Sequence, residues 1–285
     1  MTAEQTQTRI DWNKLLDEAL TAPGNLTGVY DRFWDYSFGN MMLFMMQGIH
    51  EPVASFSRWK SLGRHVIRGS KAKEVIVPIL VNEPAPEASS SGLDESDQSI
   101  AEKRERVARL IGFKAVRAVF PLSDTKGKDL PPVEIPGWNE DAALAKLGIS
   151  QVPFDSTNGN LQGWSRGVQF AINPVAVNRM KTKFHEWGHI EWGHVEWGHI
   201  VLGHTIPHHF EEYQAHRGVM EFQAEATSYL LMNELELMDE ETAAHSRGYI
   251  KHWLGEEQPP DQAIRQVFTA ADRILRVGRI AVAES

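Results

Sequence analysis

The spacing of apolar residues predicts that the chain begins with helices. From residue 11 to residue 49 apolar side chains recur with a helical period, with one break at Pro23 and Gly24. Residues 56–62 predict one further short helix, followed by a stretch whose glycines indicate turns. The first part of the chain is therefore expected to be helical before any strand begins.

Strands are predicted next. Val75–Leu80 is rich in β-branched residues, and Pro78 favours an edge position because proline donates no hydrogen bond to a neighbouring strand. A second strand is expected over Phe113–Phe120. Residues 82–99 are rich in proline, serine and acidic residues, and we expect a flexible insertion there because they cannot bury enough apolar surface to offset chain entropy. Residues 121–139 contain two adjacent prolines and indicate a linker between domains.

After this linker Val168–Ile172 predicts another strand, which could bind an extended peptide by strand addition. Helical periodicity then returns over residues 175–203, 213–237 and 260–282. We therefore expect an α+β fold with helices in excess. It would comprise a small α+β domain over residues 8–130 and a mostly helical domain over residues 140–285.

Composition excludes several classes of site. The chain has no cysteine, so disulfides, thiolate zinc sites and cysteine nucleophiles are excluded, and any metal ion must be held by histidine and carboxylate side chains. No apolar run is long enough to span a membrane and the N-terminus is polar, so we expect a cytoplasmic protein with no membrane partner. The net charge of -9 argues against a surface that binds nucleic acid all over, but six basic and no acidic residues lie between Arg58 and Lys73.

The sequence His185-Glu-Trp-Gly-His189 carries the most specific chemistry. On a helix, His185 and His189 lie one turn apart on the same face, so both imidazoles can bind one cation. Zinc suits such a site because it accepts imidazole and carboxylate ligands in a tetrahedron and leaves one position to water, whose pKa falls to about 7. Glu186 lies beside the first histidine and is the predicted catalytic base. The alternative to a metal site is a pair of histidines without a functional role, on a solvated helix face.

A later helix offers the third metal ligand. Glu221 and Glu225 are four residues apart, so they lie on one face of the predicted helix. One of them can complete a site of two histidines and one carboxylate, and the other can orient a ligand. The spacing alone leaves open which is which, and an ordinary solvated acidic stripe is the alternative.

A tandem repeat interrupts the metal helix. The sequence Glu-Trp-Gly-His occurs at Glu186, Glu191 and Glu196, so the copies begin five residues apart. Only the first copy satisfies the His-Glu-x-x-His pattern. Removing residues 191–200 restores a continuous metallopeptidase helix, so we infer a duplication. In a continuous helix ten extra residues add about 15 Å and leave the downstream residues about 80° out of phase, which is expected to disturb the third ligand. A second interpretation is that His194, His199 and His204 form a histidine-rich metal-binding tract.

These motifs resemble a known family. The C-terminal half resembles the ImmA/IrrE-type metallopeptidases, which have a His-Glu-x-x-His helix followed by a Glu-Ala-x-x-aromatic helix, here His185–His189 and Glu225–Tyr229. The resemblance implies a zincin-like fold with Zn²⁺ bound by His185, His189 and Glu225, and with Glu221 as the neighbour or alternative ligand.

The N-terminal half resembles the single-stranded-DNA-binding domain of ArdC antirestriction proteins. The matching segments are Trp12–Leu16, Tyr30–Asn40, Gln47, Trp59–Arg64, Gly69–Ala72 and Gly112–Lys114. The resemblance implies a protein that binds single-stranded DNA and protects the DNA of a mobile element from host restriction.

Side chains in this half suit nucleic-acid binding. Basic residues are expected to follow the phosphate backbone, namely Arg58, Lys60, Arg64, Arg68, Lys71 and Lys73. Aromatic residues are expected to stack on bases, namely Trp34, Tyr36, Trp59 and Phe113. Amide side chains are expected at base edges, namely Asn40 and Gln47. The apolar set that includes Trp34, Phe38 and Phe44 is better explained as core.

The leading hypothesis joins both halves. It is a single-stranded-DNA-binding protein of the ArdC type with a zinc metallopeptidase domain, whose peptide substrate the sequence does not name. One alternative is a non-catalytic DNA-binding module with a structural or disrupted metal helix. The other is a histidine-rich metal binder.

Overall fold

The first helices lie where the apolar period predicted them. In this computed structural model, the described residues are 10–21, 36–84, 106–130, 137–158, 160–191, 208–254 and 259–279. Helix α1 (Trp12–Thr21) buries its apolar face, and helix α3 (Phe38–Met46) begins after Ser37, whose side chain accepts a hydrogen bond from the backbone of Asn40. Phe38 and Phe44 are fully buried, which confirms that these two members of the apolar set are core, whereas Trp34 lies outside the described residues.

A long two-stranded ribbon follows. Strands β3 (Lys73–Pro84) and β4 (Arg106–Pro121) pair antiparallel, and β1 (Val53–Ser55) pairs with the other edge of β4. The sheet order β1-β4-β3 places β3 at an edge, as Pro78 predicted. Asn82 to Pro84, where the flexible insertion was expected to begin, instead pair with β4. Residues 85–105 lie outside the described part of the chain.

A small second sheet corrects the predicted linker. Helix α4 (Phe56–Ser61) is the short helix that the sequence predicted. Strand β2 (Arg64–Val66) follows it and pairs with β5 (Thr125–Gly127), after the short 3₁₀ turn η1 (Leu122–Asp124). The first part of residues 121–139 is thus not a free linker. Strand β5 in this segment pairs with β2, about 60 residues earlier in the chain. Local hydrophobic periodicity cannot predict a pairing between such distant residues.

The second half mixes a small sheet with helices. Its elements are α5 (Glu140–Leu147), β6 (Ser150–Gln151), β7 (Gly163–Arg166), β8 (Gln169–Ile172), α6 (Arg179–Glu191), α8 (His208–Glu234), α9 (Glu240–His252) and α10 (Asp261–Gly278). Strand β8 and helices α6, α8 and α10 were predicted, whereas α5, α9 and β7 were missed. Helices and strands are mixed throughout the described residues, so the α+β class is confirmed.

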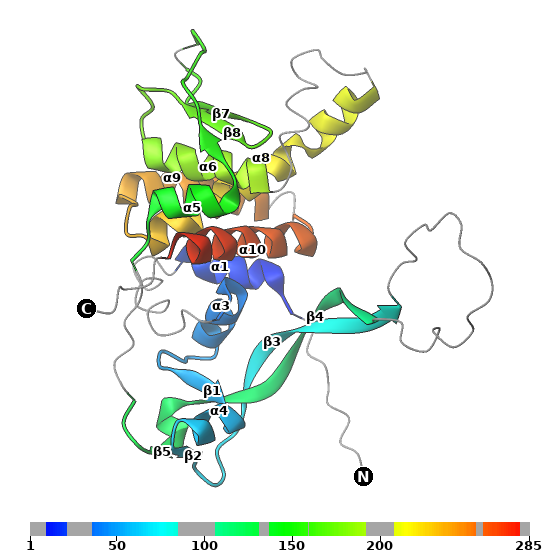
Figure 1. The fold of residues 1–285 in the computed structure, drawn as a ribbon, viewed down its shortest axis with the longest axis vertical. Helices are drawn as coiled ribbons and strands as arrows, with labels where there is room; N and C mark the ends of the chain where they lie inside the picture. The colour runs from blue at the N-terminus through cyan, green and yellow to red at the C-terminus, as the bar shows by residue number, and fades with distance from the viewer. Residues whose placement is uncertain are drawn as a thin grey trace, which may run out of the picture.

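Helix α10 joins the two halves of the chain. In Figure 1 it lies in the middle of the molecule, with β7, β8 and α6 on one side and α1, α3 and the N-terminal strands on the other. Phe268 of α10 packs against Trp12 and Phe38, with ring centroids 6.3 and 6.5 Å apart. Tyr229 of α8 donates a hydrogen bond to the carbonyl of Leu20, 3.4 Å away. One apolar cluster therefore extends through both halves, and the domain division at residues 130–140 stays a prediction.

Within the described ranges, no helix combines the length and the apolar character that crossing a bilayer requires.

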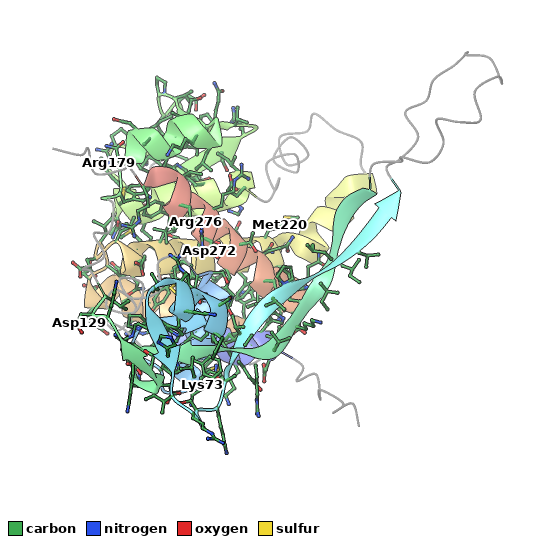
Figure 2. The ribbon with its side chains drawn as sticks, turned by 60° about the horizontal axis from the view of Figure 1, so that its bottom comes forward. Lys73, Asp129, Arg179, Met220, Asp272 and Arg276 are labelled. Carbon is green, nitrogen blue, oxygen red and sulfur yellow. The ribbon has the colours of Figure 1, made fainter. Side chains whose placement is uncertain are left out.

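A buried carboxyl group links α10 to the start of α3. The backbone amide of Phe38 donates to both carboxylate oxygens of Asp272, at 3.0 and 3.2 Å. Figure 2 shows Asp272 and Arg276 on the same helix, in the middle of the molecule. Burial raises the pKa of Asp272 to about 7, although the amide of Phe38 and the charge of Arg276 act to lower it.

We expect this carboxyl group to make stability depend on pH. The folded pKa lies above the value of about 3.9 for an unfolded chain, so the folded state binds the proton more tightly. The free energy of unfolding of the wild type, relative to Asp272→Asn, should therefore fall as the pH rises from about 4 to about 7. Urea denaturation of both proteins at pH 5 and pH 8 measures this difference. A difference that does not change with pH contradicts the prediction.

Candidate metal centre

The site depends on how closely helix α6 approaches helix α8. A Cβ atom placed on Gly188 would lie 3.1 Å from the Cα atom of Ala224 in α8. On its other side α6 buries Phe184 and Trp187, and the Trp187 ring packs against Phe170 of β8 with centroids 5.7 Å apart. Because the glycine lies inside the metal motif, its missing side chain lets α8 reach the two histidines.

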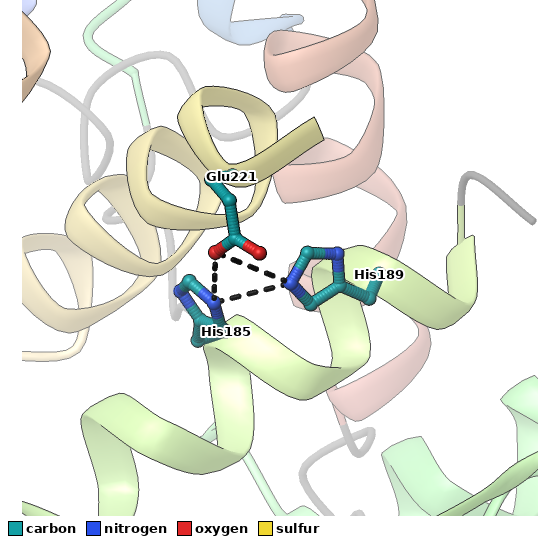
Figure 3. A group of neighbouring side chains, drawn as sticks. All are labelled: His185, His189 and Glu221. Atoms are coloured by element: carbon teal, nitrogen blue, oxygen red, sulfur yellow. Dashed lines mark hydrogen bonds and ion pairs between the residues drawn. The ribbon is translucent and has the colours of Figure 1, made fainter. Parts of the chain in front are cut away.

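The two histidines and one carboxylate converge on a single point. Figure 3 shows His185 and His189 projecting from α6 toward Glu221 of α8. The Nε2 atoms of the two histidines are 3.1 Å apart. The Oε2 atom of Glu221 lies 3.3 Å from Nε2 of His185 and 3.8 Å from Nε2 of His189. Within the described ranges this trio is a group of His and acidic residues whose ligand atoms all lie within 4.8 Å of one another.

These separations fit a tetrahedral metal ion. Zinc binds nitrogen and oxygen ligands at about 2.0–2.2 Å, which places two ligands of a tetrahedron about 3.3 Å apart. The observed separations of 3.1, 3.3 and 3.8 Å lie near this value. The donor set of two imidazoles and one carboxylate is also one that zinc accepts. The residues present therefore fit a metal ion of this kind.

Glu225 lies on the other side of His185. Its Oε2 atom is 3.4 Å from Nδ1 of His185, and its Oε1 atom is 2.7 Å from Nζ of Lys181. Burial acts to raise its pKa, but interactions with His185, Lys181 and Ser246 outweigh this and lower the pKa to about 2. The geometry thus brings together His185, His189 and Glu221, the alternative ligand of the sequence prediction. Glu225 instead faces the remaining nitrogen of His185.

The charge balance around His185 favours a cation. Burial alone lowers the pKa of an imidazole, yet interactions with Glu221, Glu225 and Glu186 raise the pKa of His185 to about 10. Three carboxylates around one ring therefore require positive charge between them. A proton on His185 or a bound divalent ion can supply it.

Glu186 lies beside this group, next to strand β7. Its side chain is buried, and a Cβ on Gly163 of β7 would lie 3.1 Å from its Oε1 atom. Burial raises its pKa, while the charge of His185 and a hydrogen bond with Ser165 act to lower it. A carboxylate with a raised pKa is suited to accepting and releasing a proton near neutral pH. The sequence did not predict the contributions of Gly163, Ser165 and Lys181.

A pocket of about 710 Å³ opens onto these side chains. Its lining includes the three grouped residues, Glu186 and strand β7 from Gly163 to Arg166. Strand β7 is an edge strand, because the sheet order is β6-β8-β7. The predicted peptide-binding strand, Val168–Ile172, corresponds to β8 and is central, so this part of the prediction is wrong. Its two edges already pair with β6 and β7.

The tandem repeat does not separate the ligands. Helix α6 ends at Glu191, which pairs with Arg273 of α10 at 2.8 Å, and residues 192–207 lie outside the described part of the chain. His194, His199 and His204 are among them, so the predicted histidine tract is not tested. Helix α8 still brings Glu221 to the two histidines, contrary to the expected disturbance of the third ligand.

Several predicted nucleic-acid ligands have structural partners instead. The buried amide of Asn40 exchanges hydrogen bonds with the backbone of Ile76, and the amide of Gln47 does the same with Glu74. Trp59 is 1% exposed and donates to the carbonyl of Phe120. These contacts argue against base recognition by Asn40, Gln47 and Trp59, because their polar atoms and ring faces are already used within the fold.

Two other predicted ligands are also engaged. Tyr36 stacks edge-on against Phe44 and donates to the carbonyl of Val53, 3.3 Å away. Arg64 donates to the side chain of Thr125 at 2.8 Å and to the carbonyl of Lys128, which ties β2 to β5. Both side chains therefore stabilise the fold of the N-terminal half.

The remaining basic residues point toward solvent. Lys60, Arg68 and Lys71 are exposed, and Lys73 is half-buried. Trp34 lies outside the described residues. Lys60, Arg68, Lys71 and Lys73 thus remain candidates for contact with phosphates.

Comparison with known proteins agrees with the resemblance of the first part of the chain. Residues 1–120 match the family described as the N-terminal domain of anti-restriction factor ArdC, so this part carries an ArdC N-terminal domain. The chain is similar to the metal-free crystal structure of the antirestriction ArdC protein from the R388 plasmid, with 15% identity, a TM-score of 0.45 and 94% of each chain covered. The Mn(II)-bound crystal structure of that protein matches with 14% identity and a TM-score of 0.46, over 95% of this chain and 98% of that one. Comparison with curated proteins gave no match.

Two substitutions should separate the roles of the acidic residues. Glu221→Ala removes the carboxylate that lies with the two histidines, and if it is the third metal ligand we expect zinc binding to weaken by several orders of magnitude. Glu225→Ala removes only the partner of His185 Nδ1, and zinc affinity should fall about 10–100-fold. Competitive zinc titration with a chromophoric chelator measures both. The reverse order of effects would make Glu225 the third ligand.

Proposed function

We propose that this chain is an antirestriction protein of the ArdC type, with a zinc-dependent peptidase site in its C-terminal half and a single-stranded-DNA-binding N-terminal half. The observation that carries the first part is the convergence of His185, His189 and Glu221 at tetrahedral separations, beside Glu186 and inside an open pocket.

The metal ion is held by residues from two helices. His185 and His189 of α6 and Glu221 of α8 supply the ligands, while Glu225 accepts a hydrogen bond from Nδ1 of His185. That hydrogen bond fixes the ring so that Nε2 faces the ion. Lys181 keeps Glu225 ionised, so the acceptor is always available. When bound, zinc lowers the pKa of a water molecule to about 7 and polarises the carbonyl group that is attacked.

Glu186 moves the proton. As a general base it accepts a proton from the attacking water, and as a general acid it returns that proton to the nitrogen of the leaving amine when the peptide bond breaks. Ser165 on β7 orients the carboxylate, and Gly163 leaves room for it. Burial keeps bulk water away from the group, which raises its pKa toward the range where both transfers are efficient.

The edge of β7 offers a binding surface for an extended peptide. Strand addition supplies main-chain hydrogen bonds without demanding a particular sequence, and β7 borders the same pocket as the metal ligands. A peptide paired with β7 would run past Glu186 and the metal ion. The substrate class is therefore a polypeptide in extended conformation.

DNA binding is the second part of the proposal. It is supported by the match of residues 1–120 to the ArdC N-terminal domain and by the exposed basic residues Lys60, Arg68 and Lys71. Binding to exposed single strands would bring the pocket close to proteins that act on incoming DNA. Protection of a mobile element from restriction follows as the biological role.

Substitution of the base tests the peptidase proposal. Glu186→Gln should keep zinc at one ion per chain but lower hydrolysis of an unstructured protein substrate, such as casein, by at least about 100-fold. The removal of zinc by a chelator should have the same effect on the wild type. A wild-type protein that carries zinc but cleaves no substrate, and whose antirestriction activity in cells is unchanged by Glu186→Gln, favours the non-catalytic binding module. Zinc uptake beyond one ion per chain favours the histidine tract.

Binding to oligonucleotides tests the DNA proposal. We expect a single-stranded 20-mer to bind more tightly than the duplex of the same length, because exposed bases can stack on the protein. The affinity should fall as salt rises, because phosphate contacts release counterions. Fluorescence anisotropy at several salt concentrations measures both. Equal affinity for both forms would remove the single-strand assignment.

A further inference from the structure

An exposed aromatic side chain begins helix α4. Phe56 is 58% exposed, whereas Trp59, three residues later, is 1% exposed and holds the helix against β4 through its hydrogen bond to Phe120. A phenylalanine left in water forgoes the stabilisation that burial would give. Single exposed apolar residues are common, so this exposure needs a second feature before it indicates a ligand.

The second feature is the charge around it. Lys60 lies one helical turn after Phe56, on the same face of α4. The carbonyl of Lys60 accepts a hydrogen bond from the amide of Gly63 at 3.1 Å, and the carbonyl of Gly63 accepts one from the amide of Lys128 at 3.3 Å. The aliphatic part of the Lys128 side chain also lies against Gly63. A continuous surface therefore runs from Phe56 across the end of α4 to β5.

Further cations extend this surface, which we call the basic tip. It consists of Phe56 and the exposed residues Arg58, Lys60, Arg68, Lys71, Lys126 and Lys128. The acidic residues of the same segments are Asp124, which is half-buried, and Asp129, which is exposed. The tip thus has an excess of positive charge in a chain whose net charge is -9.

The basic tip lies at the end of the molecule away from the metal site. Figure 1 places α4, β2 and β5 at one end, and β7, β8 and α6 at the other. Figure 2 turns the first end forward, with Lys73 and Asp129 labelled there and Arg179 of α6 labelled far from them. Contacts at the tip can therefore be changed without touching the metal ligands.

We infer that the basic tip binds single-stranded nucleic acid, with an unpaired base stacked on the ring of Phe56 and the surrounding cations on the phosphates. This inference rests on the nucleic-acid half of the proposed function and assigns it a site. A polyanion with apolar, planar groups matches a surface that combines an exposed aromatic ring with lysine and arginine side chains. Bases in a duplex are already stacked on each other, so the ring selects single strands. Phenylalanine offers no hydrogen bond to a base edge, so sequence preference should be weak.

Three substitutions of Phe56 distinguish base stacking on an aromatic ring from contact with an apolar side chain of similar size. Binding of the full-length protein to a fluorescein-labelled oligothymidine 20-mer is measured by anisotropy. Phe56→Ala should weaken binding by about tenfold, Phe56→Leu should weaken it similarly although it keeps an apolar side chain, and Phe56→Trp should keep or improve it. Affinity for a duplex should not change. Val177→Ala is the matched control, because Val177 is 95% exposed and lies in the metal half.

The cations are tested through the salt dependence. The double variant Lys126→Gln, Lys128→Gln should reduce the slope of log affinity against log salt by about 1.4, because about 0.7 is lost for each single-strand phosphate contact. Arg179→Gln removes an exposed charge at the far end and should leave the slope unchanged. Phe56→Ala should also leave the slope unchanged, because it removes no phosphate contact.

The outcomes distinguish this site from the function it rests on. If the wild type binds no single-stranded DNA, both the proposed DNA binding and the site inferred at the basic tip are wrong. If the wild type binds but all three Phe56 variants bind equally well, DNA binding stands and this site is wrong. Equal affinity for polyglutamate and oligothymidine would make the tip a general surface for anions and overturn the inference. Unchanged melting temperatures, expected because Phe56 is exposed, confirm that the variants fold.

Discussion

The close approach of helix α6 to helix α8 is the constraint on which the metal centre depends. Gly188 lets the backbone at Ala224 come so close that a side chain at this position would push the two helices apart by a few tenths of an ångström. The buried rings of Phe184 and Trp187 hold α6 from its other side. Any increase in this helix separation moves Glu221 away from the two histidines. The glycine of the metal motif is thus a packing residue that acts on the chemistry through geometry.

The charges of the site follow from this packing. Three carboxylates lie around the half-buried side chain of His185, and Lys181 provides a cation next to one of them, Glu225. Such an arrangement is costly unless a proton or a metal ion balances it. The same acids that make the site unfavourable when empty therefore give it affinity for a divalent ion. Glu186 differs from the other two because it lies toward β7, which also lines the pocket.

The sequence predicted the elements of the site better than their arrangement. Helical spacing was sufficient to place His185 and His189 on one face, and Pro78 correctly marked an edge strand. The choice between Glu221 and Glu225 was not available from spacing, since both lie on the same helix face and only the position of α6 separates them. Asn40, Gln47 and Trp59 failed as exposed ligands for a related reason. Their partners are backbone groups of β3 and β4, which a linear reading does not bring near them.

The central claim is that two imidazoles of α6 and the carboxylate of Glu221 share one divalent ion. Anomalous diffraction at the zinc edge from crystals of the zinc-loaded full-length chain tests it most directly. We expect a peak within about 2.0–2.2 Å of Nε2 of His185, Nε2 of His189 and a carboxylate oxygen of Glu221. A peak bound by Glu225 in place of Glu221, or one found only among the histidines of the repeat, would contradict it.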